Sequence, residues 1–174
     1  MFLNNFKNVI SLAIGTFLGI GLIPIMPGTI ASVVTATIWY LFIPEYFFYN
    51  PTENIIFYDR FFLLFLFLLA FSLKAVYISK ICEKEFGKDA PAIVIDEVIG
   101  YLFAILFLPK TLMVALYALV LFRIFDIMKP LYINKLQNLP HGWGVMCDDI
   151  AAGITTNIIL IGLYSVKPTF FTII

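Results

Sequence analysis

Six apolar stretches, separated by short polar segments, decide what this chain of 174 residues can fold into. The chain has a mean hydropathy of +1.01 and only 13% charged residues, whereas soluble domains carry about 25%. Apolar runs of this kind are typical of helices that lie in a bilayer. We therefore predict an all-α fold, an integral membrane helical bundle of about six helices, formed by a single domain over residues 1–174. The six stretches are 9–26, 30–44, 61–78, 99–108, 111–122 and 154–166.

Composition excludes several other classes of protein. The formal net charge is zero, so no basic surface indicates nucleic-acid binding. Cys82 and Cys147 are isolated in the sequence, which favours free buried thiols over a disulfide or a zinc site. The apolar N-terminal segment has no signal-peptide cleavage site, and we expect it to be retained. His141 is the single histidine, and in its Gly/Pro loop it is more often incidental than catalytic.

Two prolines, Pro24 and Pro27, predict the end of the first helix. Gly28 permits a tight turn, and Thr29 is a candidate N-cap for the next helix. Backbone N–H groups at such a helix start can bind a phosphate, although a plain turn and cap explain the same residues. Gly15 and Gly19 form a GxxxG pattern, which allows helices to approach closely.

A second break, at Pro109 and Lys110, decides where the acidic residues lie relative to the membrane. Pro91 fits the first turn of a helix that carries Asp96 and Glu97. If the chain turns back at Pro109, Asp96 and Asp126 lie about 20 and 24 Å from the turn, at about 1.5 Å per helical residue. We therefore favour a hairpin that returns both carboxylates to the same side.

The charges between the stretches predict which side this is. Residues 74–89 contain four lysines, whereas residues 45–60 contain three acids and one arginine. Lys and Arg accumulate in cytoplasmic loops, so we expect 74–89 inside and 45–60 outside. With helices of alternating direction, every polar motif falls on the cytoplasmic face. These motifs are Pro27-Gly28-Thr29, Asp96-Glu97, Arg123/Asp126/Lys129 and Asp148-Asp149.

Clustered carboxylates at one face indicate a site for a hard cation, most simply Mg²⁺ held through one or two carboxylates and a substrate phosphate. The spacing of Arg123, Asp126 and Lys129 fits either an anion-binding edge or an ion-pair ladder that solubilises a helix end. From the residues alone, a membrane enzyme acting on a phosphorylated lipid and a cation- or proton-coupled transporter are equally supported.

Four motifs in order resemble the phosphatidylglycerophosphatase A family over roughly residues 11 to 165. The resemblance implies a Mg²⁺-dependent phosphoric monoester hydrolase of glycerophospholipid biosynthesis, multi-pass in the bacterial inner membrane, that converts phosphatidylglycerophosphate to phosphatidylglycerol and phosphate. It implies motif acids at Asp96, Glu97, Asp126, Asp148 and Asp149, and basic positions at Arg123 and Lys129. The motifs are Gly19-Ile20-Gly21-Leu22-Ile23-Pro24-Ile25-Met26-Pro27-Gly28-Thr29, Ile95-Asp96-Glu97-Val98-Ile99-Gly100, Phe122-Arg123-Ile124-Phe125-Asp126-Ile127-Met128-Lys129-Pro130 and Gly142-Trp143-Gly144-Val145-Met146-Cys147-Asp148-Asp149-Ile150-Ala151-Ala152-Gly153.

These observations lead to one set of predicted roles. One Mg²⁺, or two, is held by a subset of the five acids Asp96, Glu97, Asp126, Asp148 and Asp149. Catalytic roles are expected for Asp96, Asp149, Asp148 and Glu97, one of them as the general base on the attacking water. The terminal phosphate is expected to bind Arg123 and Lys129, with the backbone near Gly28 and Thr29. The rival functions are a transporter with acids along a path through the membrane, and an inactive lipid-binding protein; oligomeric state stays open.

Overall fold

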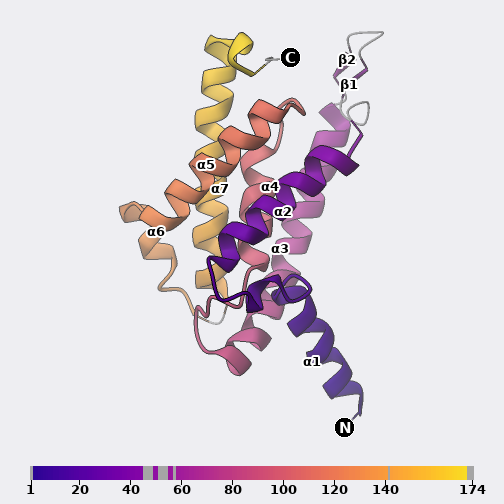
Figure 1. Cartoon of the computed structure of the whole chain (residues 1–174), viewed down its shortest axis with the longest axis vertical. Helices are drawn as coiled ribbons and strands as arrows, with labels where there is room; N and C mark the ends of the chain where they lie inside the picture. Colours follow the sequence, from indigo (N-terminus) through magenta and orange to yellow (C-terminus); the bar gives the residue numbers. More distant parts are fainter. Residues whose placement is uncertain (1, 45–48, 51–54, 57, 141, 172–174) are drawn as a thin grey trace.

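The computed structural model describes residues 2–44, 49–50, 55–56, 58–140 and 142–171, which are helical apart from one small ribbon (Figure 1). The predicted all-α class is confirmed, with seven described α-helices because a short helix, α6, follows α5. The ribbon pairs β1 (Tyr49–Asn50) antiparallel with β2 (Ile55–Ile56). The helices are α1 (Phe2–Gly15), α2 (Pro27–Phe42), α3 (Tyr58–Phe86), α4 (Ile95–Ile105), α5 (Leu112–Met128), α6 (Leu131–Leu136) and α7 (Trp143–Val166), with 3-10 turns η1 (Ile20–Leu22) and η3 (Pro168–Phe171).

Helix α4 is the central element of the bundle. It packs against α2, α3, α5 and α7, and nine of its 11 residues are buried. The buried Tyr101 hydroxyl donates to the Ala115 carbonyl of α5 at 3.1 Å. Asn157 of α7 donates from Nδ2 to the carbonyls of Ala104 and Leu106, at 3.1 and 2.6 Å. These bonds satisfy carbonyls at the end of α4 that have no partner within the helix.

Two glycines bring α4 and α7 into backbone contact. A Cβ added at Gly153 would overlap the carbonyl oxygen of Gly100, and one added at Gly100 would lie 2.8 Å from the carbonyl oxygen of Asp149. Only glycine permits this approach, because any side chain would occupy the space of the other backbone. The start of α4 is thereby held directly against the stretch of α7 that carries Asp149.

Two described helices, α3 and α7, are long and apolar enough to cross a membrane. Large apolar side chains such as Leu63, Phe67 and Leu163 are exposed on them. Helix α2 has 16 residues and α4 has 11, which at about 1.5 Å per residue is short of a hydrocarbon core of about 30 Å. Length and composition therefore suggest membrane association, whereas a bundle in which all six predicted helices cross is not supported.

The predicted hairpin at Pro109 and Lys110 is confirmed. Helix α4 ends at Ile105, and α5 begins at Leu112 after Thr111, whose hydroxyl accepts from Val114 N at 3.1 Å. The two helices pack against each other. Asp96 and Asp126 consequently lie at the same end of the bundle.

Three predicted helix starts are wrong. Helix α2 begins at Pro27, with Met26 rather than Thr29 in the N-cap position, because Met26 adopts the left-handed conformation that makes the turn. Helix α4 begins at Ile95 rather than near Pro91, because the chain first makes a turn in which Ile93 N donates to the Ala90 carbonyl, and Val94 N then donates to the Gly15 carbonyl. Helix α7 begins at Trp143, well before the apolar stretch 154–166 that predicted it, so both its acids lie inside the helix.

The first apolar stretch is also shorter as a helix than predicted. Helix α1 ends at Gly15, well before Pro24, and positive φ angles at Phe17 and Leu18 break the helical path. Gly15 packs against Cys82 of α3, whereas Gly19 lies outside any helix with no atom near its missing side chain. The GxxxG pattern is therefore not a helix-packing motif here.

Both cysteines are free, as predicted, although Cys147 is only half-buried. The predictions for His141 and for most of the 45–60 loop lie outside the described residues.

Candidate active site

Three of the five predicted acids converge at the contact between α4 and α7. One carboxylate oxygen from each of Asp96, Glu97 and Asp149 lies within 4.8 Å of the others. Asp96 and Glu97 occupy the first turn of α4, and Asp149 lies one turn before Gly153. The glycine contact between the two helices therefore sets the spacing of the three carboxylates.

This carboxylate triad fits a hard cation by its donor chemistry. Asp96 Oδ1, Glu97 Oε2 and Asp149 Oδ2 are all buried, and none has a hydrogen-bond partner among the described residues. Buried polar atoms without partners are costly, and gathered negative charges repel one another. Oxygen ligands of this kind suit Mg²⁺, so the triad is where the chain could hold such an ion.

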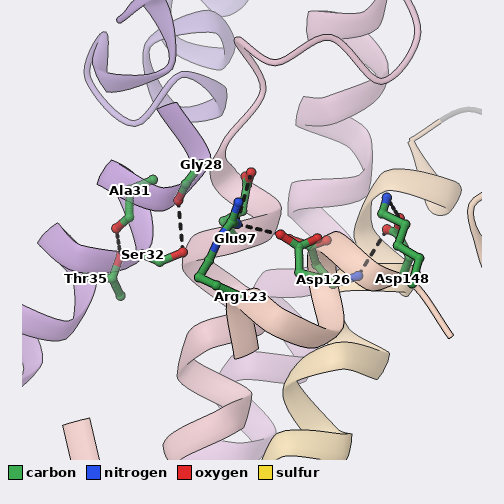
Figure 2. A network of polar contacts seen from close by, with 10 residues as sticks. Gly28, Ala31, Ser32, Thr35, Glu97, Arg123, Asp126 and Asp148 are labelled. Atoms are coloured by element: carbon green, nitrogen blue, oxygen red, sulfur yellow. Dashed lines mark hydrogen bonds and ion pairs between the residues drawn. The ribbon is translucent and has the colours of Figure 1, made fainter. Parts of the chain in front are cut away.

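The other two predicted acids are paired with the predicted basic residues. Arg123 Nη1 lies 2.5 Å from Asp126 Oδ2 and 3.8 Å from Glu97 Oε1, so its guanidinium joins the triad to Asp126. Lys129 Nζ donates to Asp148 Oδ2 at 2.5 Å. Figure 2 shows Arg123 between Glu97 and Asp126, with Asp148 on the far side of Asp126.

The start of α2 closes the site opposite α7. Gly28 faces Glu97, and an added Cβ would overlap Glu97 Oε1 and lie 3.3 Å from Arg123 Nη1 (Figure 2). The nearby Thr29 Oγ1 is buried and has no hydrogen-bond partner among the described residues. Because Gly28 has no side chain, the backbone of α2 can approach the acid cluster closely. The positive end of the α2 dipole therefore lies beside the Glu97 carboxylate.

The site is partly exposed. Asp96, Asp148 and Asp149 are buried, whereas the Glu97, Arg123 and Lys129 side chains retain 16%, 17% and 24% of their exposure. Solvent therefore reaches the site at Glu97, Arg123 and Lys129.

Lys129 is charged under ordinary conditions. Burial by itself lowers the pKa of Lys129, but the hydrogen bond and the charge of Asp148 outweigh burial and raise that pKa above its ordinary value. Lys129 and Arg123 therefore both bring positive charge to the partly exposed part of the site, where each is paired with a carboxylate.

Some of the residues that shape the site were not identified from the sequence. Asp96 and Asp149 each precede a packing glycine, Gly100 or Gly153, by four residues, so the repeated Asp-x-x-x-Gly pattern was an available signal. Gln137 donates from Nε2 to Asp89, which joins the loop before α4 to the loop before α7. No sequence pattern indicated that contact, because it depends on how α6 folds back.

Comparisons with known proteins identify the family to which the chain is similar. The family model described as phosphatidylglycerophosphatase A matches residues 13–164. A protein of Bacteroides thetaiotaomicron, provisionally named as a phosphatidylinositol-3-phosphatase, is 30% identical over 153 residues, covering 84% of this chain and 89% of the relative. The phosphatidylglycerophosphatase A of Escherichia coli K12 is 34% identical over 146 residues, covering 82% of this chain and 76% of the relative. No solved structure matches the chain.

Proposed function

The chain belongs to the phosphatidylglycerophosphatase A family and is a lipid phosphatase, and we propose that it hydrolyses phosphatidylglycerophosphate to phosphatidylglycerol and phosphate with the help of Mg²⁺. The proposal is carried by one observation: three carboxylates, each with one buried oxygen that has no hydrogen-bond partner among the described residues, converge beside two partly exposed cations. A phosphate monoester and a divalent cation together would neutralise both sets of charges.

The triad would hold the metal, which narrows the predicted set of five acids to Asp96, Glu97 and Asp149. When bound, Mg²⁺ would offset negative charge that develops on the phosphoryl oxygens during transfer. Asp126 and Asp148 then act through Arg123 and Lys129, because their carboxylates fix the positions of those side chains.

The chain's own residues suggest an order of events. Arg123 offers a planar fork of donors to phosphate oxygens, and Lys129 offers a mobile point charge. The N–H groups of Gly28 and Thr29 at the start of α2 lie on the opposite wall and fit a further phosphate oxygen. Held in this way, the terminal phosphorus is oriented for attack in line with the ester oxygen.

Hydrolysis then requires one proton acceptor. A carboxylate of the triad takes a proton from the attacking water as the new P–O bond forms and the ester P–O bond breaks. The lipid alkoxide takes up the proton that the carboxylate accepted and leaves as the alcohol, and inorganic phosphate is released. Asp149 is our preferred base, because it comes from a different helix from Asp96 and Glu97 and faces both.

We further propose that the protein is multi-pass in a bacterial inner membrane with this site at the cytoplasmic face. Three lysines, Lys80, Lys84 and Lys88, lie in the last two turns of α3 and in the loop that leads to α4, which is the end where the acids gather, whereas Lys74 lies near the middle of α3. Positive residues favour the cytoplasmic side. The mapping of accessible cysteines placed at positions 88 and 110 tests this orientation.

The transporter alternative predicts acids distributed along a path through the membrane. All five motif acids instead lie at one end of the described helices, where α4 and α7 begin and α5 ends. That distribution favours chemistry at one face.

The test is phosphate release by the purified protein in detergent, with Mg²⁺ or with a chelator. Phosphatidylglycerophosphate and phosphatidylinositol 3-phosphate are compared, because the relatives' names point to different head groups. We expect Mg²⁺-dependent release that is faster with phosphatidylglycerophosphate. Equal rates with chelator would overturn the metal assignment, and faster release from the inositol lipid would overturn the substrate assignment.

A further inference from the structure

A polar cavity of about 320 Å³ lies between α1 and α3. Its polar lining comes from Lys7 and Asn8 of α1 and from Tyr77, Lys84 and Glu85 of α3. The carboxylate triad and its cations come from α2, α4, α5 and α7, so the two sites share no residue. Figure 1 shows α1 at the end of the bundle where α4 and α7 begin.

The cavity is held open by the way α1 packs on α3. Gly15 lies against Cys82, whose thiol contacts the Ser11 carbonyl at 3.6 Å, so the last turns of α1 fit closely on α3. Toward its start, α1 diverges from α3 (Figure 1). Leu12 and Ile81 line the cavity between its polar groups and this close contact.

The charges around the cavity favour an anion. Lys7 and Lys84 face it together with one carboxylate, that of Glu85. Neither lysine has a salt-bridge partner within 4.0 Å among the described residues, whereas Lys129 in the acid site has one. Two cations that no protein carboxylate holds can bind a phosphate group, with Asn8 and the Tyr77 hydroxyl as further donors.

An apolar stripe on α3 begins at the same cavity. Tyr77, Leu73, Leu69 and Leu66 are spaced by four, four and three residues, so they share one helix face, and they are 65%, 62%, 42% and 44% exposed. From Leu66 to Tyr77 the helix rises by 11 steps, or about 16 Å, which is close to one leaflet of a hydrocarbon core of about 30 Å. The stripe is therefore about as long as an acyl chain that extends through one leaflet.

From this continuity we propose that the α1/α3 cavity and the α3 stripe form a binding site for an anionic glycerophospholipid. Lys7 and Lys84 bind the head-group phosphate, and an acyl chain lies along Leu66, Leu69 and Leu73. This lipid does not contact the triad, so it is a retained lipid rather than the substrate. The inference rests on the membrane placement proposed above, and not on the phosphatase reaction.

Native mass spectrometry of the purified protein tests the site directly. Detergent-solubilised protein is loaded with phosphatidylserine or phosphatidylcholine, and the retained lipid is counted. The variant Lys7→Gln/Lys84→Gln is compared with Lys74→Gln/Lys88→Gln, which removes two exposed lysines that do not line the cavity. All four substitutions are at the surface and leave the bundle core intact.

We expect one retained phosphatidylserine in preference to phosphatidylcholine. A basic residue near a membrane surface contributes about fivefold to anionic-lipid binding, so the cavity variant should bind about 30-fold more weakly. The affinity of the control variant for phosphatidylserine should fall by far less. Equal losses in the two variants, retention without head-group preference, or displacement of the lipid by inorganic phosphate alone would each overturn the proposal. Retention is counted without any turnover, so this result stands apart from the phosphatase assay.

Discussion

Replacement of Gly153 by alanine should damage both the fold and the site. The new Cβ would overlap the carbonyl oxygen of Gly100, and it would lie 3.0 Å from the carbonyl carbon of Gly100 and 3.1 Å from Cβ of Phe103. Because ordinary contacts between such atoms begin at about 3.4 Å, α4 and α7 must separate. Overpacking of this kind lowers the free energy of unfolding by about 1–3 kcal/mol.

The same separation would move Asp149 away from Asp96 and Glu97. A misplacement of about 1 Å lowers catalytic rates about 100-fold, so phosphate release should fall by about that factor. Gly162→Ala is the matched control, because it makes the same substitution in the same helix with no atom within 4 Å of the new Cβ. It should raise the free energy of unfolding by up to about 1 kcal/mol.

Thermal unfolding in detergent and initial rates of phosphate release measure the two effects. If Gly153→Ala matches Gly162→Ala in thermal stability and in the rate of phosphate release, the backbone contact does not set the spacing of the carboxylates, and the reasoning fails.

Three further substitutions test individual contacts. Arg123→Lys keeps the charge but loses the planar fork shared with Asp126, and kcat/KM for phosphatidylglycerophosphate should fall by about 10- to 100-fold; a wild-type value would contradict the phosphate role. Lys129→Met leaves Asp148 buried without its partner, and the midpoint of thermal unfolding should fall, reflecting a loss of about 3 kcal/mol; an unchanged midpoint would show that the pair is dispensable. Asn157→Leu removes both hydrogen bonds to the end of α4, which should cost about 2–3 kcal/mol in chemical denaturation, with phosphate release retained in the folded fraction.

The sequence was most informative where polar residues interrupt apolar runs. Pro109 and Lys110 predicted the hairpin, and the hairpin placed Asp96 and Asp126 at one end. Charged residues are costly near hydrocarbon, so their positions carry strong information about the fold.

Helix boundaries were harder to predict, because tertiary contacts decide them. The start of α4 is delayed by the bond from Val94 N to the Gly15 carbonyl, which joins two segments that are distant in the sequence. The start of α7 depends on Gly142, whose positive φ and close approach to α3 place the turn before Trp143. Neither contact leaves a local signature.

The sequence alone could not show which of the five acids form the triad and which pair with a cation. The sequence motifs predicted that all five acids lie on one face. Only the packing of Gly100 on Gly153, however, brings Asp149 close to Asp96 and Glu97. Asp148 is adjacent in sequence to Asp149, yet it pairs with Lys129 because side chains one residue apart point about 100° apart around a helix. Neighbouring acids therefore have different environments.

That difference gives the most direct test of the central claim, which is that Asp96, Glu97 and Asp149 form a divalent-cation site. The measurement is Mn²⁺ binding by electron paramagnetic resonance to detergent-solubilised wild type, Asp149→Asn and Asp148→Asn. Removal of a ligand carboxylate should weaken binding by at least about tenfold, whereas removal of its neighbour should weaken it by less than about threefold. The account predicts a large loss for Asp149→Asn alone, and equal losses or a larger loss for Asp148→Asn would contradict it.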